Sequence, residues 1–474
     1  MIAVCTVDDD APLPGAAGAA VSAVRETLLA ALRPPCPEED ALRRLTILAA
    51  ATLVLAACTP GTKEKPIADP GADVSGTVEF WHFFTDREAE AIDAVVADFQ
   101  TAHPKIKVVV KSGQDDSKMT QAIGGGQGPD VGLSYSTDIV GQFCASGAWL
   151  DLNQYIARDK VSMDAFPQTV KQYTEYKGKR CSMPVLADAY GLYYNKKLFA
   201  EAGIAGPPKT LEEFAEDAKK LTKRGPDGSI QTAGFLPLFG FYENTPSHLG
   251  PMVGAQWLKG DGSSAIGADP GWPQLLKWQK DLVDWFGYDK LEAFRASLGD
   301  EYSDANAFQK GQVAMAIDGE YRIAFAKDQA PELQFGVAPM PASTADRYGA
   351  GYVTGNVIGI SRTAKNPEAA WELIRYLTTD TKAIVKLSNS LKNIPSTKDA
   401  LASPDLKMDA EFKTFVDIFN HPKTTTTPPS SAGPAYQETF QNFCDSWQSG
   451  GASDLNAGLA GVDKQVNSLL QLGG

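Results

Sequence analysis

The sequence predicts an α/β protein built from two lobes. A chain of 474 residues is longer than one hydrophobic core usually supports. From residue 78 onward, short apolar runs typical of strands alternate with segments of helical periodicity, which is the order of a doubly wound sheet. The net charge of −14 argues against nucleic acid as a partner, because phosphate binding requires clustered Lys and Arg.

Residues 1–57 are predicted to be an upstream extension and a signal peptide, not part of the fold. Arg43 and Arg44 precede thirteen apolar or small residues, which are too few to span a bilayer but suit a signal-peptide core. The run Leu-Ala-Ala-Cys that ends at Cys58 resembles the bacterial lipobox, whose cysteine becomes the first mature residue and carries a lipid. We therefore expect a lipid anchor on Cys58, a tether over 58–73, and an extracytoplasmic protein attached to the cell membrane.

Three cysteines would remain in the mature chain besides the anchor. An exported protein can form disulfides, and Cys144 with Cys181 is the favoured pair, although their spacing does not establish it; Cys444 is then left free. No CxxC or HExxH motif occurs and the four histidines are scattered, so we expect neither a metal site nor another cofactor.

The stretch 78–86, Val-Glu-Phe-Trp-His-Phe-Phe-Thr-Asp, predicts a first strand that ends among aromatic rings. Open α/β sheets bind ligands at the carboxyl ends of their strands. There, Trp81 and Phe83 could stack on the C–H face of a sugar, and His82 and Asp86 could hydrogen-bond its hydroxyl groups. The alternative is that these rings are part of the core.

The next elements continue a β-α-β-α-β order. They are a helix that starts at Thr85 in a capping box with Glu88 and stops before Pro104, a strand over 106–110, a helix around Met119 that stops at Gly124, and a strand over 131–135.

Further along, strands and helices are joined by longer connections. The expected elements are an aromatic strand over 188–196, a helix capped by Thr210 and Glu213, a helix that ends at Gly311, a strand over 313–317, a helix opened by Pro367, an exposed loop over 421–434, and an amphipathic last helix with Leu455, Leu459, Val462, Val466 and Leu469.

Several short motifs together give the chain a family resemblance. Beside the lipobox and Trp81-His82, they are Gly-Pro-Asp-Val at 128–131, Leu-Tyr-Tyr-Asn-Lys at 192–196, Gly-Val-Ala-Pro-Met-Pro at 336–341, the glycine-rich stretch 349–359, and Asn-Pro-Glu-Ala-Ala-Trp-Glu at 366–372. Their order resembles that of the extracellular solute-binding proteins, like the maltose-binding proteins, that feed carbohydrates to bacterial ABC importers. The resemblance covers the chain from residue 74 to its end.

The resemblance implies a periplasmic-binding-protein-like fold with hinge crossings between two α/β lobes. The first lobe would comprise 74–184 and 341–393, and the second 187–338 and 394–474. The implied function is that of a lipid-anchored, monomeric binding protein, not an enzyme, that captures a carbohydrate, with an oligosaccharide expected, and delivers it to an ABC permease.

Ligand contacts are expected from aromatic rings, polar side chains and one glycine. The family commonly carries Trp where this chain has Tyr321, so a ring is kept but the choice of sugar is open. The candidate residues are Trp81, Phe83, Asp86, Tyr135, Asp188, Tyr190, Tyr242, Trp257, Glu320, Tyr321, Arg322, Gly355 and Asn356.

Two other functions remain compatible with these residues. A glycoside hydrolase would need a pair of carboxylates, which Asp318 and Glu320 could supply if the strand 313–317 continued through them. A surface sugar-sensing or adhesion lipoprotein could use the same cleft without transport.

Overall fold

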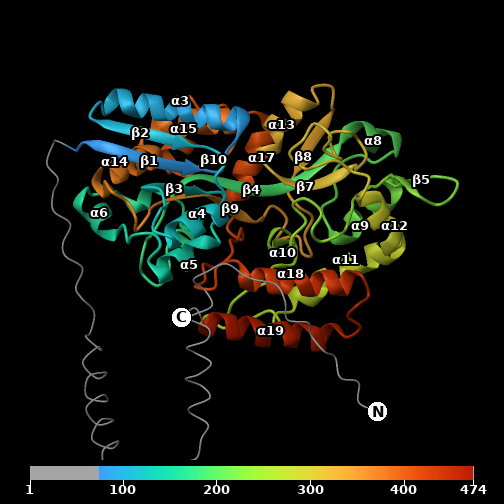
Figure 1. The fold of residues 1–474 in the computed structure, drawn as a ribbon. Helices are drawn as coiled ribbons and strands as arrows, with labels where there is room; N and C mark the ends of the chain where they lie inside the picture. Colours follow the sequence, from blue (N-terminus) through green and yellow to red (C-terminus); the bar gives the residue numbers. More distant parts are fainter. Residues whose placement is uncertain (1–73, 473–474) are drawn as a thin grey trace, which may run out of the picture. The chain divides into compact units, whose positions relative to one another are not determined.

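The computed structural model describes residues 74–472, and Figure 1 shows how their strands and helices are arranged. The signal peptide, the lipid anchor on Cys58 and the tether over 58–73 lie outside the described residues. Within 74–472, no helix combines the length and the apolar character needed to cross a membrane.

The strands are short except for β4. They are β1 (Gly76–His82), β2 (Ile106–Lys111), β3 (Val131–Ser134), β4 (Met183–Asn195), β5 (Lys223–Arg224), β6 (Ile230–Thr232), β7 (Met315–Gly319), β8 (Phe335–Ala338), β9 (Val353–Ile360) and β10 (Ile394–Pro395).

The helices fall between these strands and after them. They are α3 (Asp86–Ala102), α4 (Asp116–Gly124), α5 (Ile139–Ser146), α6 (Asn153–Arg158), the 3-10 turn η1 (Met163–Ala165), α7 (Gln168–Tyr173), α8 (Lys196–Glu201), α9 (Leu211–Leu221), α10 (Pro246–Val253), α11 (Gly271–Phe286), α12 (Tyr288–Arg295), α13 (Arg322–Gln329), α14 (Pro367–Thr379), α15 (Thr381–Leu391), α16 (Lys398–Leu401), α17 (Ala410–Phe419), α18 (Ala435–Gln448) and α19 (Leu455–Leu472).

One mixed sheet of eight strands organises the fold. Its main path runs β10-β4-β9-β3-β1-β2, and β7 and β8 also pair with β4. β1 is parallel to both β2 and β3, which confirms the β-α-β-α-β order predicted from sequence. Because parallel strands end at the same edge, the residues that follow β1 and β3 come together there, including Phe83 and Tyr135.

Strand β4 connects the two halves of the sheet. Its first half, Met183–Ala189, pairs with β9 and β10, and its second half, Tyr190–Asn195, pairs with β7 and β8. All of its residues except Tyr194 are buried. A strand that is paired on both sides and covered on both faces typically has a continuous run of apolar and aromatic residues, and the sequence of β4 has one.

Two large hydrophobic cores lie on either side of this strand. The first takes in β1, β2, β3 and β9 with α3, α14 and α15, and the second takes in α10, α11, α18 and α19. The first core also includes Tyr193 of β4 and Phe415 of α17, so the two cores meet at β4. We propose that they correspond to the two lobes; the exact boundaries given above stay a prediction.

Local sequence signals are confirmed where they involve contacts within one helix. Thr210 and Glu213 form the expected capping box, and Pro367 occupies the first turn of α14. The last helix buries Leu455, Leu459, Val462 and Val466 against the second core, as its periodicity predicts, whereas Leu469 is only partly buried.

Three local predictions are wrong. Thr85 precedes α3 but its side chain makes no capping hydrogen bond, and Asp86, the first residue of the helix, has a φ of 47°. Turns, not a helix, lead to Gly311. Residues 421–434 lack helix and strand as expected, but they are not an exposed loop, because Thr425 bridges to Tyr352, the residue before β9, and Thr427 is buried.

Cys144 and Cys181 form a disulfide with their Cα atoms 5.5 Å apart. It joins α5 to the segment just before β4, and both cysteines are buried. Cys444 is a free, buried thiol in α18.

Candidate ligand-binding cleft

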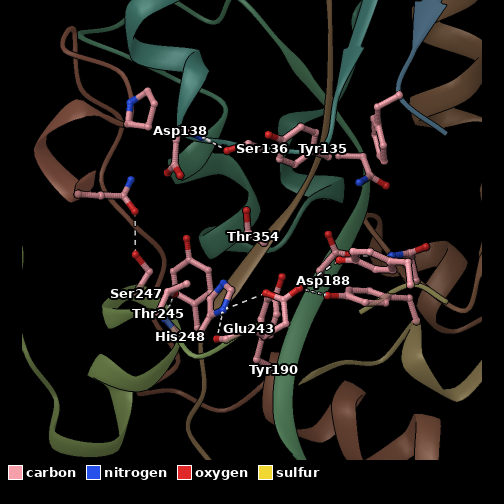
Figure 2. A pocket seen from close by; sticks show the side chains of 18 of the residues that line it. Tyr135, Ser136, Asp138, Asp188, Tyr190, Glu243, Thr245, Ser247, His248 and Thr354 are labelled. Carbon is pink, nitrogen blue, oxygen red and sulfur yellow. Dashed lines mark hydrogen bonds and ion pairs between the residues drawn. The ribbon is translucent and has the colours of Figure 1, made fainter. Parts of the chain in front are cut away.

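A cavity of about 1040 Å³ opens between the two cores. Its walls come from the residues after β1 and β3, from the loop before α10, from the start of α18, and from the middle of β4 and β9. Ligand pockets usually measure about 300–1,000 Å³, so this cavity is slightly larger than the usual range. Figure 2 shows side chains from several of these segments converging on it.

One wall carries a stack of aromatic rings. The rings of Tyr190 and His248 lie 3.8 Å apart between centroids at an interplanar angle of 18°, and Tyr352 is 5.0 Å from His248. The Nδ1 atom of His248 is 2.7 Å from the backbone oxygen of Glu243. Burial lowers the pKa of His248 despite the Glu243 carboxylate nearby, so the ring is neutral at neutral pH.

Glu243 is the polar centre of that wall. Its Oε1 accepts hydrogen bonds from the hydroxyl groups of Tyr321, at 2.7 Å, and Tyr302, at 3.1 Å, and its Oε2 lies 3.2 Å from Nδ1 of His248. The carboxylate therefore fixes two tyrosine rings and one imidazole along the cavity, which prepares flat faces for stacking.

A second polar group lies where β4 passes the cavity. Asn393 donates from Nδ2 to Asp188 and also to Glu320, at 3.3 Å, and Glu320 accepts from the backbone nitrogen of Ala189 at 2.8 Å. Burial raises the pKa of both carboxyl groups, and the proximity of Asp188 holds that of Glu320 well above its usual range.

Two buried acceptors at the cavity have no partner among the described residues. Asn356 and Asn393 both line the cavity, and they are 3% and 4% exposed. The Oδ1 atom of each makes no hydrogen bond. An unsatisfied buried acceptor costs about 1–3 kcal/mol, so a ligand that brings hydrogen-bond donors gains from pairing with these oxygens.

Eight of the thirteen candidate residues line the cavity. They are Phe83, Asp86, Tyr135, Asp188, Tyr190, Trp257, Tyr321 and Asn356. Trp257 is 7% exposed and packs edge-on against Trp272 and Tyr436, so one side of its ring belongs to the second core. Whether these side chains touch a ligand stays a prediction.

Trp81 and His82 do not lie at the cavity, because the first strand continues through His82. Side chains alternate along a strand, so Phe80 and His82 face the core and Trp81 faces the opposite side. The Trp81 indole donates to Glu79 and lies under the Lys111 ammonium. Burial lowers the pKa of His82 to about 4, so this ring is a neutral core residue.

The other four candidates outside the cavity have structural contacts. The hydroxyl of Tyr242 donates to the Gly299 oxygen at 2.6 Å. A Cβ on Gly355 would lie 2.4 Å from the Leu186 oxygen, so glycine is needed for β9 to pair with β4. Glu320 binds Ala189 and Asn393, as described above, and Arg322 is 1% exposed.

The carboxylate pair of the hydrolase hypothesis is not available for catalysis. Asp318 binds the Arg322 guanidinium through Oδ2 at 2.6 Å, and neither Asp318 nor Glu320 lines the cavity. Carboxylate oxygens of Glu243, Glu301 and Asp318 lie within 4.8 Å of one another. Arg322 pairs with Glu301 and Asp318, so these two carboxylates already have a cationic partner.

Sequence reasoning missed several cavity residues. Glu88, Asp138, Glu243, His248 and Tyr302 all line it. These side chains come from loops and helix starts that no motif marks.

The fold and the cleft together define a two-lobed solute-binding protein. The sequence profile of the bacterial extracellular solute-binding proteins matches residues 85–384, and the chain belongs to this family. It is a binding protein and not an enzyme, as the resemblance implied. The family also places it outside the cytoplasm.

Relatives and solved structures agree with this assignment. The chain is 25% identical over 352 residues to a maltotriose-binding protein of Pyrococcus abyssi, covering 73% of this chain and 72% of that one. It is 22% identical over 392 residues to a multiple sugar-binding protein of Streptococcus mutans, covering 80% and 89%.

Two solved structures show the same fold. CpMnBP1 with mannotriose bound superposes with a TM-score of 0.74 at 24% identity, over 83% of this chain and 100% of that one. The GacH receptor of Streptomyces glaucescens, solved unliganded and with acarbose, gives 0.69 at 22% identity, over 84% and 99%.

Proposed function

We propose that this protein captures a carbohydrate in the cleft and delivers it to the permease of an ABC importer while anchored to the membrane through Cys58. Oligosaccharides are the expected ligands. The single observation that carries the proposal is a large cavity lined by aromatic rings and by two residues with unsatisfied hydrogen-bond acceptors.

The chemistry of the walls suits a sugar. The C–H face of a pyranose is apolar and stacks on rings such as Tyr190 and Tyr135, while its hydroxyl groups donate to carboxylates and amide oxygens. The 1040 Å³ cavity has more room than one sugar ring fills. The relatives named for sugars, and the structures solved with mannotriose and acarbose, support the same ligand class.

A carbohydrate panel tests the proposal. A ligand that binds the folded chain and not the unfolded one raises the melting temperature with increasing ligand concentration. We expect one group of saccharides to stabilise the mature protein and to be recovered intact. A saccharide recovered cleaved would contradict the assignment as a binding protein, and no response to any saccharide would contradict the ligand class.

A pair of variants locates the binding site. Tyr135 is 52% exposed, lines the cavity and meets Phe83 edge-on at 5.5 Å, so Tyr135→Ala should weaken binding at little cost in stability. Trp285 is 42% exposed and does not line the cavity. Trp285→Ala is therefore the matched control, and it should bind like the parent protein.

Delivery needs a second experiment. Vesicles containing the permease encoded with this protein should take up the sugar only when the lipidated protein is present. If uptake proceeds equally without it, the protein is a sugar sensor or adhesin and not the importer's binding component.

A further inference from the structure

The cleft is strongly acidic. Its lining contains six carboxylate side chains, and Arg87 is the one lysine or arginine residue in that lining. The acidic residues are Asp86, Glu88, Asp138, Asp188, Glu243 and Glu438. A cleft whose low-dielectric walls carry one sign of charge concentrates ligands of the opposite charge.

The basic groups of the cleft do not offset this charge. Arg87 donates to the Ser390 oxygen at 2.6 Å and lies 3.4 Å from Asp328, outside the cavity, and its Nη2 lies 3.8 Å from Glu88, so it offsets at most one of the six carboxylates. His248 is neutral because burial lowers its pKa. The cleft therefore keeps an excess of acidic over basic side chains.

The carboxylates lie on different walls. Asp138 comes from the start of α5 and Glu243 from the loop before α10, and Figure 2 shows both beside the cavity, with Asp188 on the strand between the two cores. Burial raises the pKa of Asp138, Asp188 and, to about 7, Glu88, where it outweighs the opposing effect of Arg87.

Two unpartnered acceptors suit a ligand that donates hydrogen bonds, whereas the unpartnered Nη2 of Arg87 and Nε2 of Gln437 suit the oxygen atoms of a sugar. The buried Oδ1 atoms of Asn356 and Asn393 accept hydrogen bonds and cannot donate them. An ammonium group carries three donors, no acceptor and a positive charge. The faces of Tyr190 and Tyr321 add favourable surfaces for a cation.

We propose that the ligand is an amine-bearing saccharide whose ammonium group is bound at the Asp188 and Glu243 side of the cleft. The inference rests on the proposed function and narrows its ligand class. The rings hold the sugar, and the carboxylates select the amine over the hydroxyl group of a neutral sugar and exclude uronic acids and sugar phosphates.

Matched saccharide pairs test this inference by calorimetry. Short oligomers of glucose, galactose and mannose are each compared with the 2-amino-2-deoxy counterpart of the same linkage and with its N-acetylated form, at low and high salt. We expect the amine of the recognised series to bind roughly 10- to 100-fold more tightly than its neutral partner, with a preference that falls as salt rises.

Charge variants identify the selecting group. Glu243→Gln keeps an acceptor for the two tyrosine hydroxyls and removes the charge, so the ratio of amine affinity to neutral-sugar affinity should fall to within about threefold. Glu332→Gln, an exposed carboxylate away from the cavity, is the control and should retain the preference.

The outcomes separate this inference from the function on which it rests. A neutral sugar that binds as tightly as its amine counterpart, or more tightly, overturns the inference and leaves capture of carbohydrate intact. An amine preference that survives Glu243→Gln overturns the assignment of that carboxylate. Absence of binding to all members of the panel overturns the proposed function itself.

Discussion

Removing the disulfide should cost the protein about 4 kcal/mol of unfolding free energy. Cys144 and Cys181 are 37 residues apart in sequence. In the chain-entropy model, a cross-link that closes a loop of this length removes about 13 cal/mol/K from the unfolded chain, which amounts to about 4 kcal/mol at 25 °C. Both cysteines are buried, so Cys144→Ala/Cys181→Ala is preferable to serine, which would bury two hydroxyl groups.

Urea unfolding of the mature domain measures this cost. The oxidised parent protein, the double variant and the parent protein under reductant are compared by the same spectroscopic probe, after thiol titration has shown that two thiols appear only on reduction. The double variant and the reduced protein should unfold at similar urea concentrations, both well below the oxidised protein. Cys444→Ala controls for the loss of a buried sulfur, because this cysteine closes no loop.

Two results would refute the reasoning. A loss below about 1 kcal/mol in the double variant would mean that the cross-link barely restricts the unfolded chain. An equal loss in Cys444→Ala would mean that buried sulfur, and not loop closure, accounts for the effect.

Three further changes test particular contacts. Burial raises the pKa of Asp116 to about 7, so the folded state binds the proton more tightly than the unfolded state and stability falls as pH rises from about 4 to about 7. Asp116→Asn should remove this slope and stabilise the protein at pH 8, by at most about 4 kcal/mol. If the unfolding free energies of the parent protein and the variant changed with pH in parallel, the raised pKa of Asp116 would be wrong. A Cβ on Gly141 of α5 would lie 2.3 Å from the Ser430 oxygen, so Gly141→Ala should destabilise the fold by about 1–3 kcal/mol in urea, and an unchanged midpoint would show that the two segments separate freely. Arg322→Met should lower the unfolding free energy by about 3–5 kcal/mol because it leaves Asp318 buried without its cation. Adding Asp318→Asn should restore part of this loss, and equal losses in the single and double variants would mean that the ion pair is not the cause.

Much of the fold could be predicted because it is encoded locally. The strands and helices of the first β-α-β-α-β segment follow from apolar periodicity, and the start of α14 follows from Pro367. The capping box fails at Thr85 and succeeds at Thr210, although both sequences fit it. At Thr85 the next residue takes a positive φ at the cleft edge, which changes the geometry of the first turn.

The cleft was predictable only in part. Phe83 and Tyr135 reach it because the carboxyl ends of parallel strands meet, a rule that sequence order can supply. Trp81 does not reach the cleft because β1 continues through His82, and a side chain within the strand points to the face opposite to that of its neighbours. Glu243 and His248 could not be found, since no local pattern distinguishes them from other loop residues.

The sequence by itself determined the family, the α/β class and the positions of most strands and helices, because these depend on the order of motifs and on periodicity within short segments. The tertiary structure decided which side chains form the binding cleft and that carboxylates dominate its charge. The physical reason is that the cleft is assembled from segments that are distant in sequence, such as those of Glu88 and Glu438. Their proximity depends on how the strands pair with β4, and no pattern within one segment records it.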